Sequence, residues 1–234
     1  MRQLVFFMLF ILLQISAAAQ ANGIVVGGKW ADQVSISDVN GRPFEKKYDD
    51  VNGQPFFDAN PKWATITLAD GKVFRKVKSR INLVDQTLVF TAANNVEAFI
   101  TAGSVREISY DDTSAMGIGK TLFRTGYPGD NRTINTFYQV LAEGRCSLLK
   151  SIVKKISERK NELSGEVSKE IETNETYYLY RDNQLTRIKK DRSSILPLLA
   201  DRKELVQQYL NSEKPNLKND NELAKLINYY NQQP

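Results

Sequence analysis

The chain has 234 residues, a formal net charge of +5, one cysteine and no histidine. The absence of histidine excludes Ser-His-Asp and Cys-His catalytic groups, histidine general bases and the usual histidine-bearing zinc sites. The single cysteine excludes an internal disulfide, so packing must stabilise the fold, and we expect Cys146 to be a small buried side chain. The modest positive charge is spread along the chain and indicates a mixed surface, without a nucleic-acid-binding motif.

Residues 1–21 are predicted to be a cleavable secretory signal. Arg2 precedes an uncharged apolar run, residues 4–13, and small residues follow. A membrane-spanning helix needs roughly 20 residues, so this shorter run disfavours a retained anchor. Cleavage after Ala19 is preferred, and cleavage after Ala21 is the alternative. Because no cysteine lies near either point, we expect an exported product, periplasmic or secreted, with no lipid anchor and no transmembrane span.

Residues 22–47 are weakly patterned and are expected to form a loosely structured lead-in. Residues 48–190 are predicted to form an antiparallel β domain, because short β-branched and aromatic runs alternate there with turn residues. The strongest local signal is Asp70 followed by glycine, a two-residue hairpin turn between strands at 63–68 and 73–78.

The same alternation continues along the chain, and further strands are predicted at 81–84, 88–91, 96–100, 105–110 and 121–125. Links of two residues join only antiparallel neighbours, so the strands are expected to follow one another as a meander. A hairpin is predicted from 137–142 and 146–153, although the second segment also fits helical spacing. The charged stretch 159–174 is expected to be a mobile loop. A last hairpin is predicted from 176–181 and 185–188.

Residues 191–234 change to helical spacing and are expected to be a helical tail packed on the sheet, since such short helices are unstable alone. Asp201 and Asp220 are the predicted N-caps of two of these helices. The sequence therefore predicts a mainly β (α+β) fold. Its antiparallel β-meander forms an open sheet or half-barrel, and two to three short C-terminal helices follow.

A basic run between the predicted strands is one candidate site. It consists of Lys150, Lys154, Lys155, Arg159 and Lys160. These side chains would suit an anionic partner, such as lipid headgroups or a surface polysaccharide. A solvated strand or helix face is the alternative interpretation.

A cluster of tyrosines in the last part of the chain is the second candidate site. It consists of Tyr177, Tyr178, Tyr180, Tyr209 and Tyr230. These rings would line a groove for a glycan or a peptide, or they would pack the helices against the sheet.

Three weaker patterns do not support a catalytic or ligand-binding site. The segment 117–121, GIGKT, resembles the end of a phosphate-binding loop, but the strand and helix that such a loop joins are missing. The acidic pairs at 49–50 and 111–112 place neighbouring carboxylates on opposite faces of a strand, so turn capping is the favoured role. No catalytic residue, cofactor or metal site is expected.

Three segments carry a resemblance to known sequences: YDDVNG at 48–53, LAEG at 141–144 and LINYYN at 226–231. With the strands between them, they resemble a group of uncharacterised exported β-rich proteins typical of Bacteroidetes. The resemblance implies an envelope or secreted setting and a strand-then-helix layout. It brings no known activity and no catalytic residues.

These patterns favour a non-catalytic envelope or secreted protein that acts as a binding or interaction module. Its partner would be an envelope protein, a lipid or a glycan. The alternative is a carrier of a lipid or another hydrophobic ligand in a half-barrel. A hydrolase that uses carboxylates is the less favoured alternative.

Overall fold

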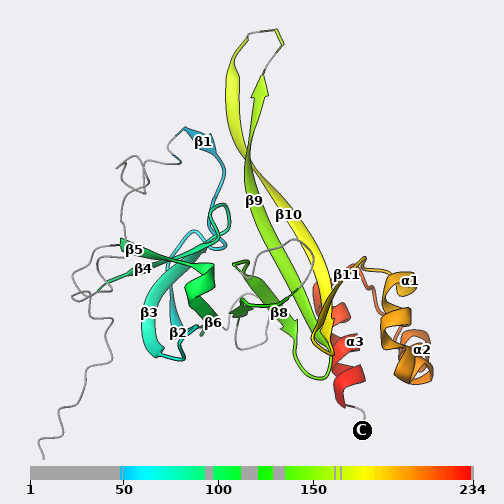
Figure 1. The fold of residues 1–234 in the computed structure, drawn as a ribbon. Helices are drawn as coiled ribbons and strands as arrows, with labels where there is room; N and C mark the ends of the chain where they lie inside the picture. The colour runs from blue at the N-terminus through cyan, green and yellow to red at the C-terminus, as the bar shows by residue number, and fades with distance from the viewer. Residues whose placement is uncertain are drawn as a thin grey trace, which may run out of the picture.

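One sheet of eleven strands and a helical tail make up the described part of the chain (Figure 1). The fold comes from a computed structural model, which describes residues 48, 50–92, 97–111, 121–128, 135–160, 162–163 and 165–232. The predicted signal and lead-in lie outside these residues. So do Asp49, Asp112 and all of the segment 117–121 except Thr121.

The elements confirm a mainly β, α+β fold. The strands are β1 (Val51–Asn52), β2 (Lys62–Leu68), β3 (Val73–Asn82), β4 (Thr87–Thr91), β5 (Glu97–Thr101), β6 (Val105–Tyr110), β7 (Thr121–Arg124), β8 (Tyr138–Ala142), β9 (Ser147–Lys160), β10 (Val167–Arg181) and β11 (Gln184–Ile188). The helical elements are η3 (Ala102–Ser104), α1 (Arg192–Ile195), η4 (Leu196–Arg202), α2 (Lys203–Ser212) and α3 (Asp220–Gln232). None of the described helices is long and apolar enough to cross a membrane.

The strand order departs from a simple antiparallel meander at two steps: β1 pairs in parallel with β10 instead of with β2, and β6 pairs with β2 instead of β5. Across the sheet it is β5-β4-β3-β2-β6-β7-β8-β9-β10, and β1 and β11 both pair with β10. β6 follows β5 after the three residues of η3, yet it pairs with β2. In a flat sheet β5 and β6 would lie about 19 Å apart, whereas three residues span only about 10 Å. The five strands β5, β4, β3, β2 and β6 therefore curl, as the strands of a half-barrel do.

The inner side of this curl is packed by the protein's own side chains. In β2, Ala64, Ile66 and Leu68 point inward and are buried, while Trp63 on the other face is exposed. This two-residue period is that of a strand with one buried face. The larger members of the core are Ile66, Leu68, Val77, Ile81, Leu83, Leu88, Phe90, Ile100, Val105, Ile108, Phe123 and Phe137.

The second half of the sheet is covered on both faces. On β9, Leu148 packs in one cluster with buried residues of the helices, and α3 lies against β8 and β9. The next residue, Leu149, points the other way and packs with Tyr138, Tyr178 and Leu185. The helical tail therefore packs on one face of the sheet, as its short helices require.

A long hairpin projects from the sheet. β9 and β10, of 14 and 15 residues, pair from Ser147 with Tyr180 to Lys160 with Val167. Figure 1 shows its distal half extending beyond both the curled strands and the helices. The prediction of a mobile loop at 159–174 is wrong, because most of these residues lie in the paired strands β9 and β10. An exposed two-stranded ribbon is polar on both faces, so its composition is that of a loop.

The C-terminal end of α3 is tied to the turn between β8 and β9. The side chain of Asn231 accepts a hydrogen bond from the Cys146 N–H at 2.9 Å and donates one to the Cys146 carbonyl at 2.8 Å. A Cβ at Gly144 would lie 2.6 Å from Asn231 Cγ, so only glycine fits beneath this side chain. Two segments that carry the resemblance, 141–144 and 226–231, thus contact each other.

The other end of α3 is tied to the sheet through Asp220. Its carboxylate accepts hydrogen bonds from Lys150 at 3.0 Å, Lys190 at 2.8 Å and the Tyr177 hydroxyl at 3.1 Å. The capping expected of Asp220 falls to Asn219, whose side chain accepts from two backbone N–H groups of the first turn. Asp220 therefore joins the helix to β9 and β10.

Asp201 has a similar role and is not the cap of α2, which begins at Lys203. Its carboxylate accepts a hydrogen bond from the Tyr230 hydroxyl at 2.9 Å and pairs with Arg181 at 2.6 Å and Arg145 at 3.3 Å. These contacts join η4 to α3 and to the end of β10.

We predict that Asn231→Ala destabilises the protein by about 1–3 kcal/mol, because the buried N–H and carbonyl of Cys146 lose their partner. Asn228→Ala, the same substitution in the same helix, should change the free energy of unfolding by less than about 0.5 kcal/mol. Urea unfolding of both variants gives the comparison. Equal losses would show that Asn231 does not fix the turn.

We predict that protonation of Asp220 at low pH lowers the free energy of unfolding. Burial alone would raise the pKa of Asp220, but hydrogen bonds from Lys190, Lys150 and Tyr177 outweigh it and lower the pKa. The stabilisation is therefore complete above the carboxyl pKa of the unfolded chain, about 4, and is lost as the pH falls through the lower folded pKa. Between about pH 6 and about pH 3, unfolding in urea should show a smaller loss of stability for Asp220→Asn than for the wild type. An identical pH dependence would contradict this role.

Candidate functional site

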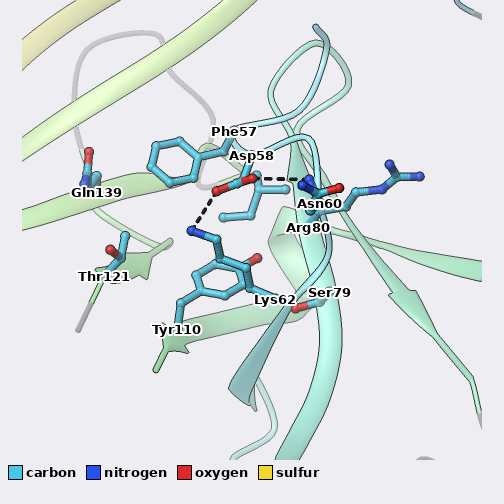
Figure 2. A pocket seen from close by; sticks show the side chains of 10 residues that line it. Phe57, Asp58, Asn60, Lys62, Ser79, Arg80, Tyr110, Thr121 and Gln139 are labelled. Carbon is cyan, nitrogen blue, oxygen red and sulfur yellow. Dashed lines mark hydrogen bonds and ion pairs between the residues drawn. The ribbon is translucent and has the colours of Figure 1, made fainter. Parts of the chain in front are cut away.

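A cavity of about 230 Å³ lies at the mouth of the curl, where the inner faces of five strands meet the segment before β2 (Figure 2). It is lined by Phe57, Asp58, Asn60, Lys62, Ser79, Arg80, Ile81, Tyr110, Thr121 and Gln139. Barrel mouths are common places for ligand sites. The core inside the curl is packed, so the cavity begins where that packing ends.

Strand register brings the lining residues to one face. Directly paired residues on antiparallel neighbours point to the same side of a sheet. The pairs that build the cavity are Lys62 with Ser79, Tyr110 with Thr121, and Phe123 with Gln139. β2, β3, β6, β7 and β8 thus each turn a polar side chain toward the same space.

Three polar side chains of the cavity lining are buried, and two of them, Ser79 and Tyr110, make no normal hydrogen bond to any described residue. Ser79, Tyr110 and Gln139 are 1%, 4% and 5% exposed. The hydroxyls of Ser79 and Tyr110 lie near each other, but neither makes a hydrogen bond of normal geometry. No described residue bonds to the Gln139 amide. Each buried polar group without a partner lowers the stability of the folded protein by about 1–3 kcal/mol. A bound polar group that supplied the missing hydrogen bonds would restore this stability.

Tyr110 is held as a hydrogen-bond donor. Burial raises the pKa of its hydroxyl far above the ordinary value, so the proton is retained at every physiological pH. Its ring makes an edge contact with Phe123, their centroids being 6.4 Å apart, and Phe57 contacts Phe123 in the same way at 4.9 Å. The cavity thus combines aromatic walls with fixed hydroxyl groups.

The charged side chains of the cavity lining are paired with opposite charges. Lys62 pairs with Asp58 at 2.7 Å, and Asp58 also accepts the backbone N–H of Asn60 at 3.2 Å (Figure 2). Arg80 points away from the other lining side chains and binds both carboxylate oxygens of Glu97, at 3.1 and 3.2 Å. A ligand in the cavity therefore meets little net charge.

The described lining residues contain neither a pair of carboxylates nor a nucleophile bonded to a base. Among the described lining residues, Asp58 is the one carboxylate, whereas glycoside hydrolysis uses two across a cleft. None of those side chains is a cysteine, and the serine has no general base bonded to it. The described residues also contain no group of three or more metal-ligating side chains.

The predicted basic run does not form one surface. Lys150 is only 8% exposed and lies beneath the helices, paired with Asp220 and with Glu175 at 2.8 Å. The ammonium of Lys154 donates to two backbone carbonyls in the segment before β2.

The other three members of the run lie on the projecting part of the hairpin. Arg159 pairs with Glu170 at 3.2 Å and Glu172 at 3.5 Å, while Lys155 and Lys160 are exposed. An anionic partner at these positions stays a prediction.

The predicted tyrosines are divided between two faces of the sheet. On β10, Tyr177 points to the helices, whereas Tyr178 and Tyr180 belong to the cluster on the other face. Tyr230 lies in α3 among the helix contacts, and Tyr209 of α2 packs on the ring of Tyr229 at 4.7 Å. The structure does not bring the five together in one groove.

Sequence reasoning missed the cavity because its polar residues are scattered singly over five strands. One signal was present: a polar side chain stands in an inward position between apolar ones. Ser79 has Val77 and Ile81 on either side at the strand period, whereas Lys62 and Tyr110 each have one apolar neighbour at that spacing. Such residues mark a polar spot on a buried face.

Comparisons of the chain with protein-family models, with curated proteins and with solved structures found no match. The resemblance to exported proteins of Bacteroidetes therefore stays a prediction.

We predict that Tyr110→Phe leaves the stability of the ligand-free protein unchanged or raises it by up to about 1 kcal/mol, because the lost hydroxyl has no partner. Tyr230→Phe is the matched control. Its hydroxyl binds the carboxylate of Asp201, so its loss should cost about 1–3 kcal/mol. Thermal and urea unfolding would measure both changes, and a clear loss in Tyr110→Phe would show that its hydroxyl is paired.

Proposed function

We propose that this chain is an exported, non-catalytic binding module whose ligand enters the cavity at the mouth of the curl. The observation that carries the proposal is a pair of buried hydroxyls in the cavity lining, those of Ser79 and Tyr110, that make no hydrogen bond of normal geometry, beside the amide of Gln139. Folding leaves such groups unpaired only rarely, and binding sites are among the places where it does. The aromatic walls supply apolar contact area for the same ligand.

The size of the cavity supports a small ligand group over a lipid. Sites for drug-sized ligands have volumes of roughly 300–1,000 Å³, and this cavity has about 230 Å³. The interior of the curl, where a carrier would hold an acyl chain, is packed with side chains such as Ile66, Leu88 and Phe90. The single carboxylate, Asp58, likewise gives less support to a hydrolase than to a binding protein.

The setting of this function is proposed from the N-terminus. A secretory signal at 1–21 would place the module in the periplasm or outside the cell, where envelope components are its available ligands. The natural partner would then be an envelope glycan, or a peptide or protein that offers a small polar group to the cavity.

Protein-observed NMR tests the proposed function. The isotope-labelled protein, purified as its own cells process it, is titrated with the low-mass fraction of an envelope extract. We expect shifts at the backbone amides of Ser79, Tyr110 and Gln139. Thr121→Phe, which fills the cavity, should abolish them. Thr87→Val, which removes a buried unpaired hydroxyl outside the cavity, should leave them unchanged.

Two results of this titration would contradict the proposal. One is the absence of shifts around the cavity. The other is a set of shifts that Thr121→Phe leaves in place, which would locate the binding elsewhere. A lipid extract that shifts core residues would instead support the carrier.

A second measurement addresses export. The mass of the protein recovered from its own cells should correspond to a chain that begins at Gln20, or at Asn22 if cleavage follows Ala21. The uncleaved chain, beginning at Met1 and recovered with the membrane fraction, would contradict the proposed export.

A further inference from the structure

We infer that the cavity receives one neutral polyhydroxyl ring, a monosaccharide unit of a glycan. This inference rests on the proposed function and specifies the ligand class. Four properties of the cavity point to it: its volume, its balanced charge, the kind of hydrogen-bonding groups that face it and its aromatic walls.

Volume limits the ligand to a single ring. An engineered protein cavity of about 150 Å³ holds benzene, and this cavity has about 230 Å³. The additional space suits a six-membered ring that carries hydroxyl groups. A nucleotide, a disaccharide or an acyl chain would extend well beyond the lining residues.

Balanced charge favours a neutral ligand. Asp58 and Lys62, both in the lining, neutralise each other, and the guanidinium of Arg80 is already bound by Glu97. A free anion or cation would have to compete with these ion pairs for either partner. A neutral ligand enters without displacing a charged group from its partner.

The uncharged lining groups match hydroxyls. Ser79, Tyr110 and Thr121 each contribute a hydroxyl to the lining residues, those of Ser79 and Tyr110 being buried, and Gln139 contributes an amide; each of these groups both donates and accepts. A sugar hydroxyl also donates and accepts, so it can satisfy any of these groups. A ligand that only donates or only accepts would leave part of them unpaired.

The walls match the apolar face of a sugar ring. Phe57 and Tyr110 both line the cavity, and in Figure 2 their rings lie on either side of the Asp58–Lys62 ion pair. A pyranose has C–H groups on its faces and hydroxyls around its edge, so its faces suit aromatic walls while its edge reaches the polar groups. The same surface binds a fully polar molecule less well, because the rings offer it no hydrogen bonds.

The experiment is an NMR titration of the processed protein with the methyl glycosides of glucose, galactose, mannose and N-acetylglucosamine. Serine, glutamine and inorganic phosphate are titrated in parallel. One of the glycosides should shift the cavity amides with a dissociation constant in the millimolar range, as expected for so small a ligand. The other three classes of compound should bind more weakly than that glycoside.

Substitutions locate the binding. Tyr110→Phe and Gln139→Met should each raise the dissociation constant of the glycoside that binds most tightly by about five- to tenfold. Each substitution removes hydrogen bonds to the sugar. Thr87→Val, the control with a buried unpaired hydroxyl elsewhere, should change the affinity by less than about twofold. Tyr110→Phe removes a hydroxyl without a normal hydrogen bond, and Gln139→Met keeps the length of the side chain, so folding is not expected to suffer.

The outcomes separate the ligand class from the proposed function. If serine, glutamine or phosphate binds in the cavity and the glycosides do not, the sugar inference is wrong while the binding module stands. If a glycoside binds equally well to Tyr110→Phe and Gln139→Met, the sugar site lies elsewhere and the inference is wrong. If no compound of either titration, pure or extracted, shifts the cavity amides, both proposals fail.

Discussion

The structure depends on one constraint: the apolar face of an eleven-stranded sheet has to be buried along its whole width. The chain meets it in two ways. From β2 to β6 the sheet curls over its own side chains, and the three-residue connection η3 permits no flat alternative. From β8 to β11 the helical tail covers the same face, with Asp220 and Asn231 fixing the two ends of α3.

The cavity lies near the boundary between the curled part of the sheet and the part that the helical tail covers. On the inner face of β9, Leu148 belongs to the helix-covered core and Ile152 to the curled core, with Lys150 between them. Gln139 of β8 pairs with Lys150 and faces the cavity. Polar side chains are tolerated in this zone because neither core reaches across it, so the same geometry that completes the fold leaves room for a ligand.

Local patterns predicted most strands and the pairing of most chain neighbours, but not the pairing of β6 with β2 or of β1 with β10. Asp70 and the alternation around it predicted a hairpin that the structure confirms, although its turn is longer than two residues and is closed by a hydrogen bond from the Leu68 N–H to the Lys72 carbonyl. The pairing of β6 with β2 depends on the curl of the whole sheet, which no local pattern encodes. The predicted basic run and tyrosine cluster do not form single sites for a related reason. Neighbouring residues of a strand, such as Lys154 and Lys155, point to opposite faces of the sheet. The cavity residues are separated in sequence and could be found only through register.

The most direct test of this account is a high-resolution crystal structure of the protein purified from its own cells, with attention to the density in the cavity. The account predicts an ordered ligand or ordered water hydrogen-bonded to the Tyr110 hydroxyl and the Gln139 amide. It would be contradicted by a cavity filled with the protein's own side chains, with both groups paired to them, because the site would then be part of the core.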